Sequence, residues 1–156
     1  MKAVIDIRKP LAGNDLLLEM ALAVKEDHDK HHYVGNQLGS YSLTISHCTT
    51  HRSVCVNIWQ HGKHVICCPN IPNTRSFSLH YGLVYDHQYG RVGFLDITNN
   101  CLIQVLDRVD STSVLWPMFG VYYSYYSTVN MSLVVGNEIS MSEGKKVLIA
   151  KSLVSF

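Results

Sequence analysis

The sequence predicts an all-β fold, an antiparallel sandwich of two sheets, and three observations lead to this prediction. Residues 81–97 form two apolar segments joined by a polar turn that ends in glycine. Several more short apolar segments are separated by clusters of Gly, Asn, Asp, Pro and Ser, which favour turns. Little of the chain has the pattern of a long helix. Many short strands at this spacing are typical of sandwiches and barrels.

The pattern at 81–97 predicts a half-buried β-hairpin. Apolar residues recur there at every second position, the period at which side chains fall on one face of a strand. Gly90 stands where a hairpin loop of three to five residues needs a positive φ. The same alternation, with the later LWPMF segment, predicts a set of core residues. These are Leu83, Tyr85, Val92, Phe94, Leu115 and Phe119.

Similar reasoning assigns the other elements in order. The expected strands cover residues 2–7, 16–24, 40–45, 53–60, 64–68, 101–106 and 129–135. Residues 16–30 are rich in Leu, Met, Ala and Glu, which also favour a helix. We expect a strand over 16–24 with a loop after it. The apolar run near the C-terminus, within 137–156, could form an extra strand that covers an open sheet edge.

Composition restricts the class of protein. A chain of 156 residues with 47% hydrophobic content suits a single domain over 1–156, which can bury roughly two-thirds of the surface of its unfolded chain. Thirteen basic residues against twelve acidic ones leave a net charge of +1, so neither nucleic acid nor a charged membrane surface is the expected partner. No uncharged apolar run approaches the roughly 20 residues that span a bilayer. Five cysteines without framework spacing favour a reducing compartment, and we expect a cytoplasmic protein.

Neither catalysis nor metal binding is expected. The chain has no G-x-S-x-G elbow, no phosphate-binding G-x-x-x-x-G-K-[ST] loop and no H-E-x-x-H pair, so we expect no enzyme and no cofactor. His61, His64, Cys67 and Cys68 offer ligands that suit zinc or copper. However, His61 lies in a turn, whereas Cys67 is several residues along the strand, and adjacent cysteines point to opposite faces. We therefore predict no metal site.

These segments resemble the SPRY domain family. The 81–97 hairpin resembles its signature hairpin, and LWPMF (115–119) resembles its "LxPhF" strand. KAVIDI, LEMALAV, the segment 31–45 and QHGK (60–63) match further family segments in the same order, so that the resemblance covers about 2–135. The family's usual tryptophans are replaced near Val4 and by Tyr41, and the PRY segment is missing. The resemblance implies a concanavalin-like jelly roll.

The resemblance also implies a function. SPRY domains bind a protein or peptide partner through loops at one end of the sandwich, and many of them recognise targets for ubiquitin ligases of the tripartite-motif class or act in innate immunity. Here the corresponding loops are 46–52, the region of 59–63 and 122–128. The last reads YYSYYST, and tyrosine is enriched in binding surfaces. The predicted contact residues are His47, Thr49, His51, Arg52, Trp59, His61, Tyr122, Tyr123, Tyr125 and Tyr126.

Two alternatives stay open. Tyr122 and Tyr125 could be core residues on a strand while only Tyr123 and Tyr126 face water, and at least one exposed tyrosine is expected in either case. The protein could also be a structural module, a homo-oligomer that associates through the tyrosine-rich face or through the C-terminal strand.

Overall fold

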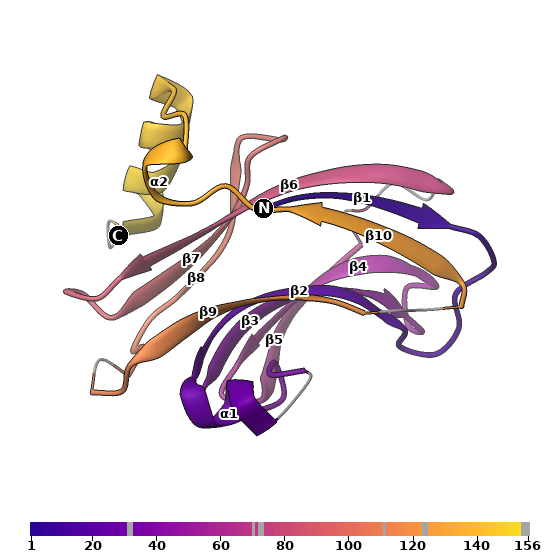
Figure 1. Ribbon diagram of the computed structural model, residues 1–156, viewed down its shortest axis with the longest axis horizontal. Coiled ribbons are helices and arrows are strands. Elements are labelled where there is room, and N and C mark those ends of the chain that lie inside the picture. The colour runs from indigo at the N-terminus through magenta and orange to yellow at the C-terminus, as the bar shows by residue number, and fades with distance from the viewer. Residues whose placement is uncertain (31–32, 70, 72–73, 111, 123–124, 154–156) are drawn as a thin grey trace. The chain divides into compact units, whose positions relative to one another are not determined.

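The computed structural model describes residues 1–30, 33–69, 71, 74–110, 112–122 and 125–153. Most of them lie in two antiparallel five-stranded sheets, which confirms the predicted all-β sandwich (Figure 1). The chain divides into two compact units. Unit 1 comprises Met1–Ala3, Ser78–Thr112 and Met131–Phe156, and unit 2 comprises Val4–Phe77 and Ser113–Asn130.

The strands follow most of the predicted segments closely, but the strand expected over 129–135 lies at 127–132. They are β1 (Lys2–Ile7), β2 (Leu16–Val24), β3 (Ser40–Cys48), β4 (Ser53–Gln60), β5 (Lys63–Cys68), β6 (Ser76–Asp86), β7 (Arg91–Asp96), β8 (Cys101–Leu106), β9 (Leu115–Val121) and β10 (Ser127–Ser132). One sheet has the order β10-β1-β6-β7-β8, and the other, here called the second sheet, has the order β5-β4-β3-β2-β9. Helices are α1 (Lys25–Lys30), the 3₁₀ turn η1 (Gly136–Glu138) and α2 (Glu143–Leu153).

One face of the second sheet is apolar. Met20 of β2 pairs with Leu43 of β3, and Leu43 pairs with Ile58 of β4, so that the three side chains form a row across the sheet. All three are fully buried. Side chains alternate between the faces of a strand, so their neighbours Leu18 and Ile45 lie on this same face. This row forms the centre of the core of unit 2.

The opposite face of the same sheet carries a polar row beside a small apolar cluster of Ala21, Ala23, Val34 and Met118. Glu19 pairs with Thr44, Thr44 with Asn57, and Asn57 with Cys67, which gives a polar row across β2, β3, β4 and β5. Glu19 and Thr44 are nevertheless buried. Buried polar groups need hydrogen-bond partners, and this polar face is therefore the part of the sheet where a site can be built.

The predicted core is only partly correct. Val92 and Phe94 of β7 are fully buried, between β6 and β8. Leu83 and Tyr85, in contrast, are only half-buried. The backbone of Tyr81 pairs with Met1, where the chain enters β1, so β6 beyond Tyr81 pairs with β7 alone. Leu115 and Phe119 are also half-buried, because β9 is an edge strand that pairs with β2 alone.

The two helices replace a predicted loop and a predicted strand. The expected loop after β2 is the six-residue α1, which has Glu26 and Asp27 in its first turn and Lys30 in its last turn, an order that suits the helix dipole. The C-terminal segment forms α2 and not a strand, because most of its residues favour helices and its buried residues, Leu148 and Ser152, are four positions apart. Figure 1 shows α2 beside β7 and β8, against which it packs.

Candidate ligand site on the second sheet

A cavity of about 620 Å³ lies on the polar face of the second sheet, at the end where β3 turns into β4. We call it the β3–β4 cavity. Side chains of β3, β4, β5 and the loop before β2 line it, together with Tyr33 and the 49–51 turn. The lining residues are Asn14, Leu16, Tyr33, Thr44, Ser46, His47, Cys48, Thr49, Thr50, His51, Asn57, Trp59, His64 and Cys67.

The β3–β4 turn forms one rim of this cavity. Cys48 pairs with Ser53, so residues 49–52 form a four-residue turn. Arg52 closes it with a φ of 51°, a left-handed conformation that only a few per cent of non-glycine residues adopt. The backbone N–H of His47 donates to Asp15 O at 2.9 Å, and His47 Nδ1 lies 2.7 Å from Gly13 O. These contacts join the rim to the loop before β2.

An aromatic wall stands beside the polar row. The indole Nε1 of Trp59 donates to Thr44 Oγ1 at 3.1 Å, which fixes the orientation of the ring. Tyr33 meets that ring edge-on with the centroids 6.4 Å apart, and the His64 ring lies 4.7 Å away on a tilted plane. His64 Nε2 is in turn 3.1 Å from Asn57 Oδ1. These contacts fix the three rings of the wall relative to one another.

A fully buried carboxylate, Glu19, accepts hydrogen bonds from segments next to the β3–β4 cavity. It accepts hydrogen bonds from Ser42 Oγ at 2.6 Å, Tyr122 Oη at 2.8 Å and the Val34 backbone N–H at 3.2 Å. Burial raises the pKa of Glu19 above its ordinary value, and these hydrogen bonds offset part of that rise. Burial likewise raises the pKa of Tyr122, so its hydroxyl stays protonated and can donate. Glu19 thereby connects Tyr122, which follows β9, and the 33–35 segment to β2.

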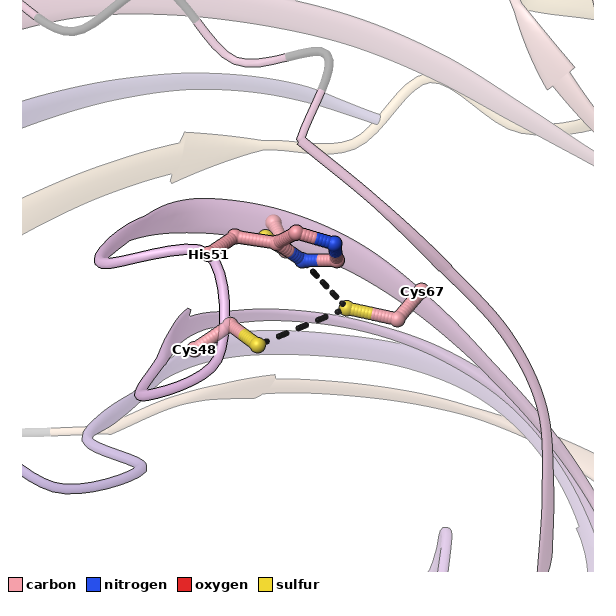
Figure 2. A group of neighbouring side chains, drawn as sticks. Cys48, His51 and Cys67 are labelled. Atoms are coloured by element: carbon pink, nitrogen blue, oxygen red, sulfur yellow. Dashed lines mark hydrogen bonds between the residues drawn. The ribbon is translucent and has the colours of Figure 1, made fainter.

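Cysteine and histidine side chains converge at the cavity rim. One ligand atom from each of Cys48, His51, Cys55 and Cys67 lies within 4.8 Å of the other three. His51 Nδ1 is 3.4 Å from both Cys55 Sγ and Cys67 Sγ, and Cys67 Sγ is 3.7 Å from Cys48 Sγ. Figure 2 shows Cys48, His51 and Cys67 pointing toward one another. All five cysteines of the chain are free thiols.

The thiols differ in acidity. Hydrogen bonds, first from the backbone N–H of His51 and also from Cys67 and Thr50, lower the pKa of Cys48 to about 6 against the opposing effect of burial. Burial raises the pKa of Cys67 to about 12, and burial also raises the pKa of Cys55. One thiol of the group is thus stabilised as the thiolate by the turn that follows it.

The structure brings together four of the predicted contact residues. His47, Thr49, His51 and Trp59 all line the β3–β4 cavity. Tyr122 lies at the same end of the sheet, where its backbone N–H donates to Leu17 O at 3.0 Å, but its hydroxyl is occupied by Glu19. Arg52 is exposed in the turn and does not line the cavity.

Other predicted residues lie elsewhere. His61 is in the β4–β5 turn, at the opposite end of β4 from His51, and its Nδ1 is 2.6 Å from Leu38 O. Tyr125 and Tyr126 are exposed, 72% and 40% of their surface, which confirms that exposed tyrosines occur in this segment. Tyr125 is not the core residue that one alternative predicted. Tyr123 lies outside the described residues.

Sequence reasoning missed several members of the site. Tyr33, Glu19, Cys48 and Cys55 were not predicted as site residues. The prediction of no metal site rested on His61, His64, Cys67 and Cys68, of which only Cys67 belongs to the converging group. The reason for that prediction therefore does not apply to the group that does converge. The C-x₂-H-x₃-C spacing of residues 48–55 could have indicated the converging group, because a tight turn within it brings the cysteines and the histidine together.

Neither a protein-family model nor a curated protein matches the chain. In the part of the chain that the structure describes, no helix is both long and apolar enough to cross a membrane.

Proposed function

We propose that the protein is a SPRY-like recognition module that binds a short segment of a protein partner in the β3–β4 cavity, without catalysing a reaction. The observation that supports this most is the cavity itself, which combines a hydrogen-bonded aromatic wall with hydroxyl, amide and imidazole groups. Ligand sites typically have such a composition, with a few polar groups fixed among apolar and aromatic ones.

The lining indicates the chemistry of the partner. Among its described residues there is no Asp, Glu, Lys or Arg. The hydroxyl oxygens of Thr44 and Ser46 accept from Trp59 and Asn57, so their O–H groups can donate to the main chain of a peptide. Trp59 and Tyr33 offer flat apolar surfaces. An uncharged peptide segment with at least one apolar side chain suits this surface better than an acidic or basic one.

We place this activity in the cytoplasm, in target recognition for a ubiquitin ligase or in innate immune signalling. The resemblance to SPRY domains supports this role, and the five free cysteines suit a reducing compartment. The ligase chemistry would belong to another domain or subunit.

Selection from a library of displayed peptides tests the proposal, followed by calorimetric titration of the selected peptides. Thr49 is exposed on the cavity rim, so Thr49→Arg should block the cavity without unfolding the protein, and affinity should fall at least tenfold. Leu38→Arg is the matched control, since Leu38 is 81% exposed and does not line the cavity. Equal affinity of the parent and Thr49→Arg, with both folded, would contradict the proposal.

A second candidate is self-association through the tyrosine segment. Tyr125 and Tyr126 contact each other edge-on, and Lys9 Nζ lies 4.3 Å from the centroid of the Tyr125 ring. Exposed tyrosine rings are enriched in protein interfaces, and the contact with Lys9 is a cation–π interaction.

A further inference from the structure

The spacing of the four converging ligand atoms corresponds to a metal tetrahedron. With Zn–S bonds of about 2.3 Å and Zn–N bonds of about 2.05 Å, tetrahedral angles place two sulfurs about 3.8 Å apart and a sulfur about 3.6 Å from a nitrogen. The Cys48–Cys67 distance is 3.7 Å, and both distances from His51 Nδ1 to sulfur are 3.4 Å. All four atoms lie within 4.8 Å of one another.

Strand pairing explains why the cysteines meet. Cys55 of β4 pairs with Ser46 of β3, and Cys48 lies two residues beyond Ser46, on the same face. Cys67 of β5 pairs with Asn57, which lies two residues beyond Cys55 and so also on that face. The three sulfurs thus come from three adjacent strands.

The β3–β4 turn supplies the fourth ligand. It brings His51 back over the sheet, so that Nδ1 faces Cys55 and Cys67. The turn also directs the backbone N–H groups of Thr50 and His51 at Cys48 Sγ. Backbone donors of this kind stabilise a negatively charged sulfur.

We propose that Cys48, His51, Cys55 and Cys67 bind one Zn²⁺ ion as a Cys₃His centre. The three thiols lose their protons to solvent and bind as thiolates, and neutral His51 binds through Nδ1. Because the protein supplies all four ligands, no position stays open for water or substrate, and the centre is structural and not catalytic. Cys55 is fully buried but His51 is exposed, which leaves the ion a route from solvent.

The ion would join β3, β4, β5 and the turn between β3 and β4. Thr49 and Thr50 of that turn line the cavity, so zinc would hold this rim in place. The inference is independent of the partner proposed above, because the ligand geometry stands whether or not the cavity binds a peptide.

A disulfide between Cys48 and Cys67 is the competing use of these residues, since their sulfurs lie 3.7 Å apart. It would remove two thiols and leave His51 and Cys55 unused. The two cases differ in measurable ways: zinc protects thiols until a chelator removes it, whereas a disulfide is opened only by a reductant.

The first test uses the full chain, purified under reducing conditions with zinc present. Elemental analysis should find one zinc per chain, and a chelator should release it and lower the melting temperature. Replacement of zinc by Co²⁺ should give the intense visible absorption of tetrahedral cobalt with thiolate ligands. Only trace zinc together with no such absorption after Co²⁺ addition would overturn the proposal, as would a Cys48–Cys67 disulfide that persists in the protein prepared with zinc.

Variants test the ligand set. Cys67→Ser and His51→Ala should each weaken Zn²⁺ binding at least tenfold in competition with a chromophoric chelator. Cys68→Ser is the matched control, because Cys68 is the next residue on β5 and its side chain points to the other face. His51 is exposed, so His51→Ala should fold even if Cys67→Ser does not. Zinc affinity that is the same in His51→Ala and Cys68→Ser would exclude His51 and overturn the four-ligand centre.

Discussion

At the scale of single residues, Glu19 is a buried carboxylate that needs hydrogen-bond donors from its neighbours. Its carboxylate is fully buried, yet it receives donors from β3, from Tyr122 just after β9 and from the 33–35 segment. A buried charge is tolerated only when such donors surround it. Gly120 belongs to the same arrangement, because a Cβ at this position would lie 2.9 Å from the hydroxyl oxygen of Tyr122.

Substitutions should separate the hydrogen-bonding role of Glu19 from its charge. Glu19→Ala leaves the Val34 N–H and the Tyr122 hydroxyl without their acceptor, and should lower the free energy of unfolding by about 2 to 4 kcal/mol. Glu19→Gln keeps an oxygen for these donors, and the Ser42 hydroxyl can rotate to accept from the new amide. We expect it to be at least as stable as the parent at neutral pH. Urea unfolding of the three proteins measures this.

The difference in stability between the parent and Glu19→Gln should depend on pH. Because the pKa of Glu19 is raised above its ordinary value of 4.5, the folded state holds this proton more tightly than the unfolded state. The stability that the proton contributes is present below 4.5 and is lost as the pH rises through the folded pKa. The free energy of unfolding of the parent should therefore fall relative to that of Glu19→Gln across this interval. A difference that does not change with pH would contradict the burial of an ionisable group here.

At the scale of elements, the packing of α2 against β7 requires a glycine at position 93 of that strand. A Cβ added at Gly93 would lie 2.8 Å from the Cβ of Ser152, a distance that real side chains do not adopt. The helix end is further held by Arg91, whose Nη1 donates to Leu153 O at 2.6 Å. Gly93 therefore allows the close approach of helix and strand, which is a common reason for glycine within a strand.

A double-mutant cycle tests this contact. Gly93→Ala should lower the free energy of unfolding by about 1 to 3 kcal/mol through overpacking. In a Ser152→Gly background the clash is absent, so the same change should cost much less. Ser152→Ala is the control, because it removes the hydroxyl but keeps the Cβ that clashes. If Gly93→Ala costs the same in both backgrounds, α2 does not pack against Gly93 in solution.

At the scale of the whole molecule, the question is whether the chain recognises another protein or itself. The segment that was expected to pair as a C-terminal strand is the helix α2, so the described part of it offers no strand edge for self-association. The exposed Tyr125 and Tyr126 are the surface left for that role.

Light scattering after size exclusion should find a monomer over a wide range of protein concentration, as a recognition module for other proteins requires. The comparison variant is Tyr125→Ala with Tyr126→Ala, which removes both exposed rings. A dimer that forms with increasing concentration and disappears in this double variant would favour the structural role instead.

The sequence alone determined the strands and the class of fold. Period-two alternation and turn residues are local signals, so β1, β2, β4 and β8 begin and end where predicted. Local signals do not say which strands become neighbours. Leu83 and Phe119 have the pattern of core residues, but their burial depends on whether their strand has a neighbouring strand on both edges. Each lies where only one neighbour is present. The C-terminal helix was not predicted, because a short apolar run is compatible with either a strand or a helix. Its packing against β7 and β8 selects the helix.

The candidate site was even less accessible from sequence. His47, Thr49, His51 and Trp59 could be predicted, because they lie near turns that the resemblance singled out. Cys48, Cys55 and Cys67 come from three strands, and only the pairing register places them on one face within reach of His51. A shift of one residue in either pairing would turn a sulfur to the other face of the sheet. The tertiary structure alone therefore decided that these side chains meet, because register is a property of the assembled sheet.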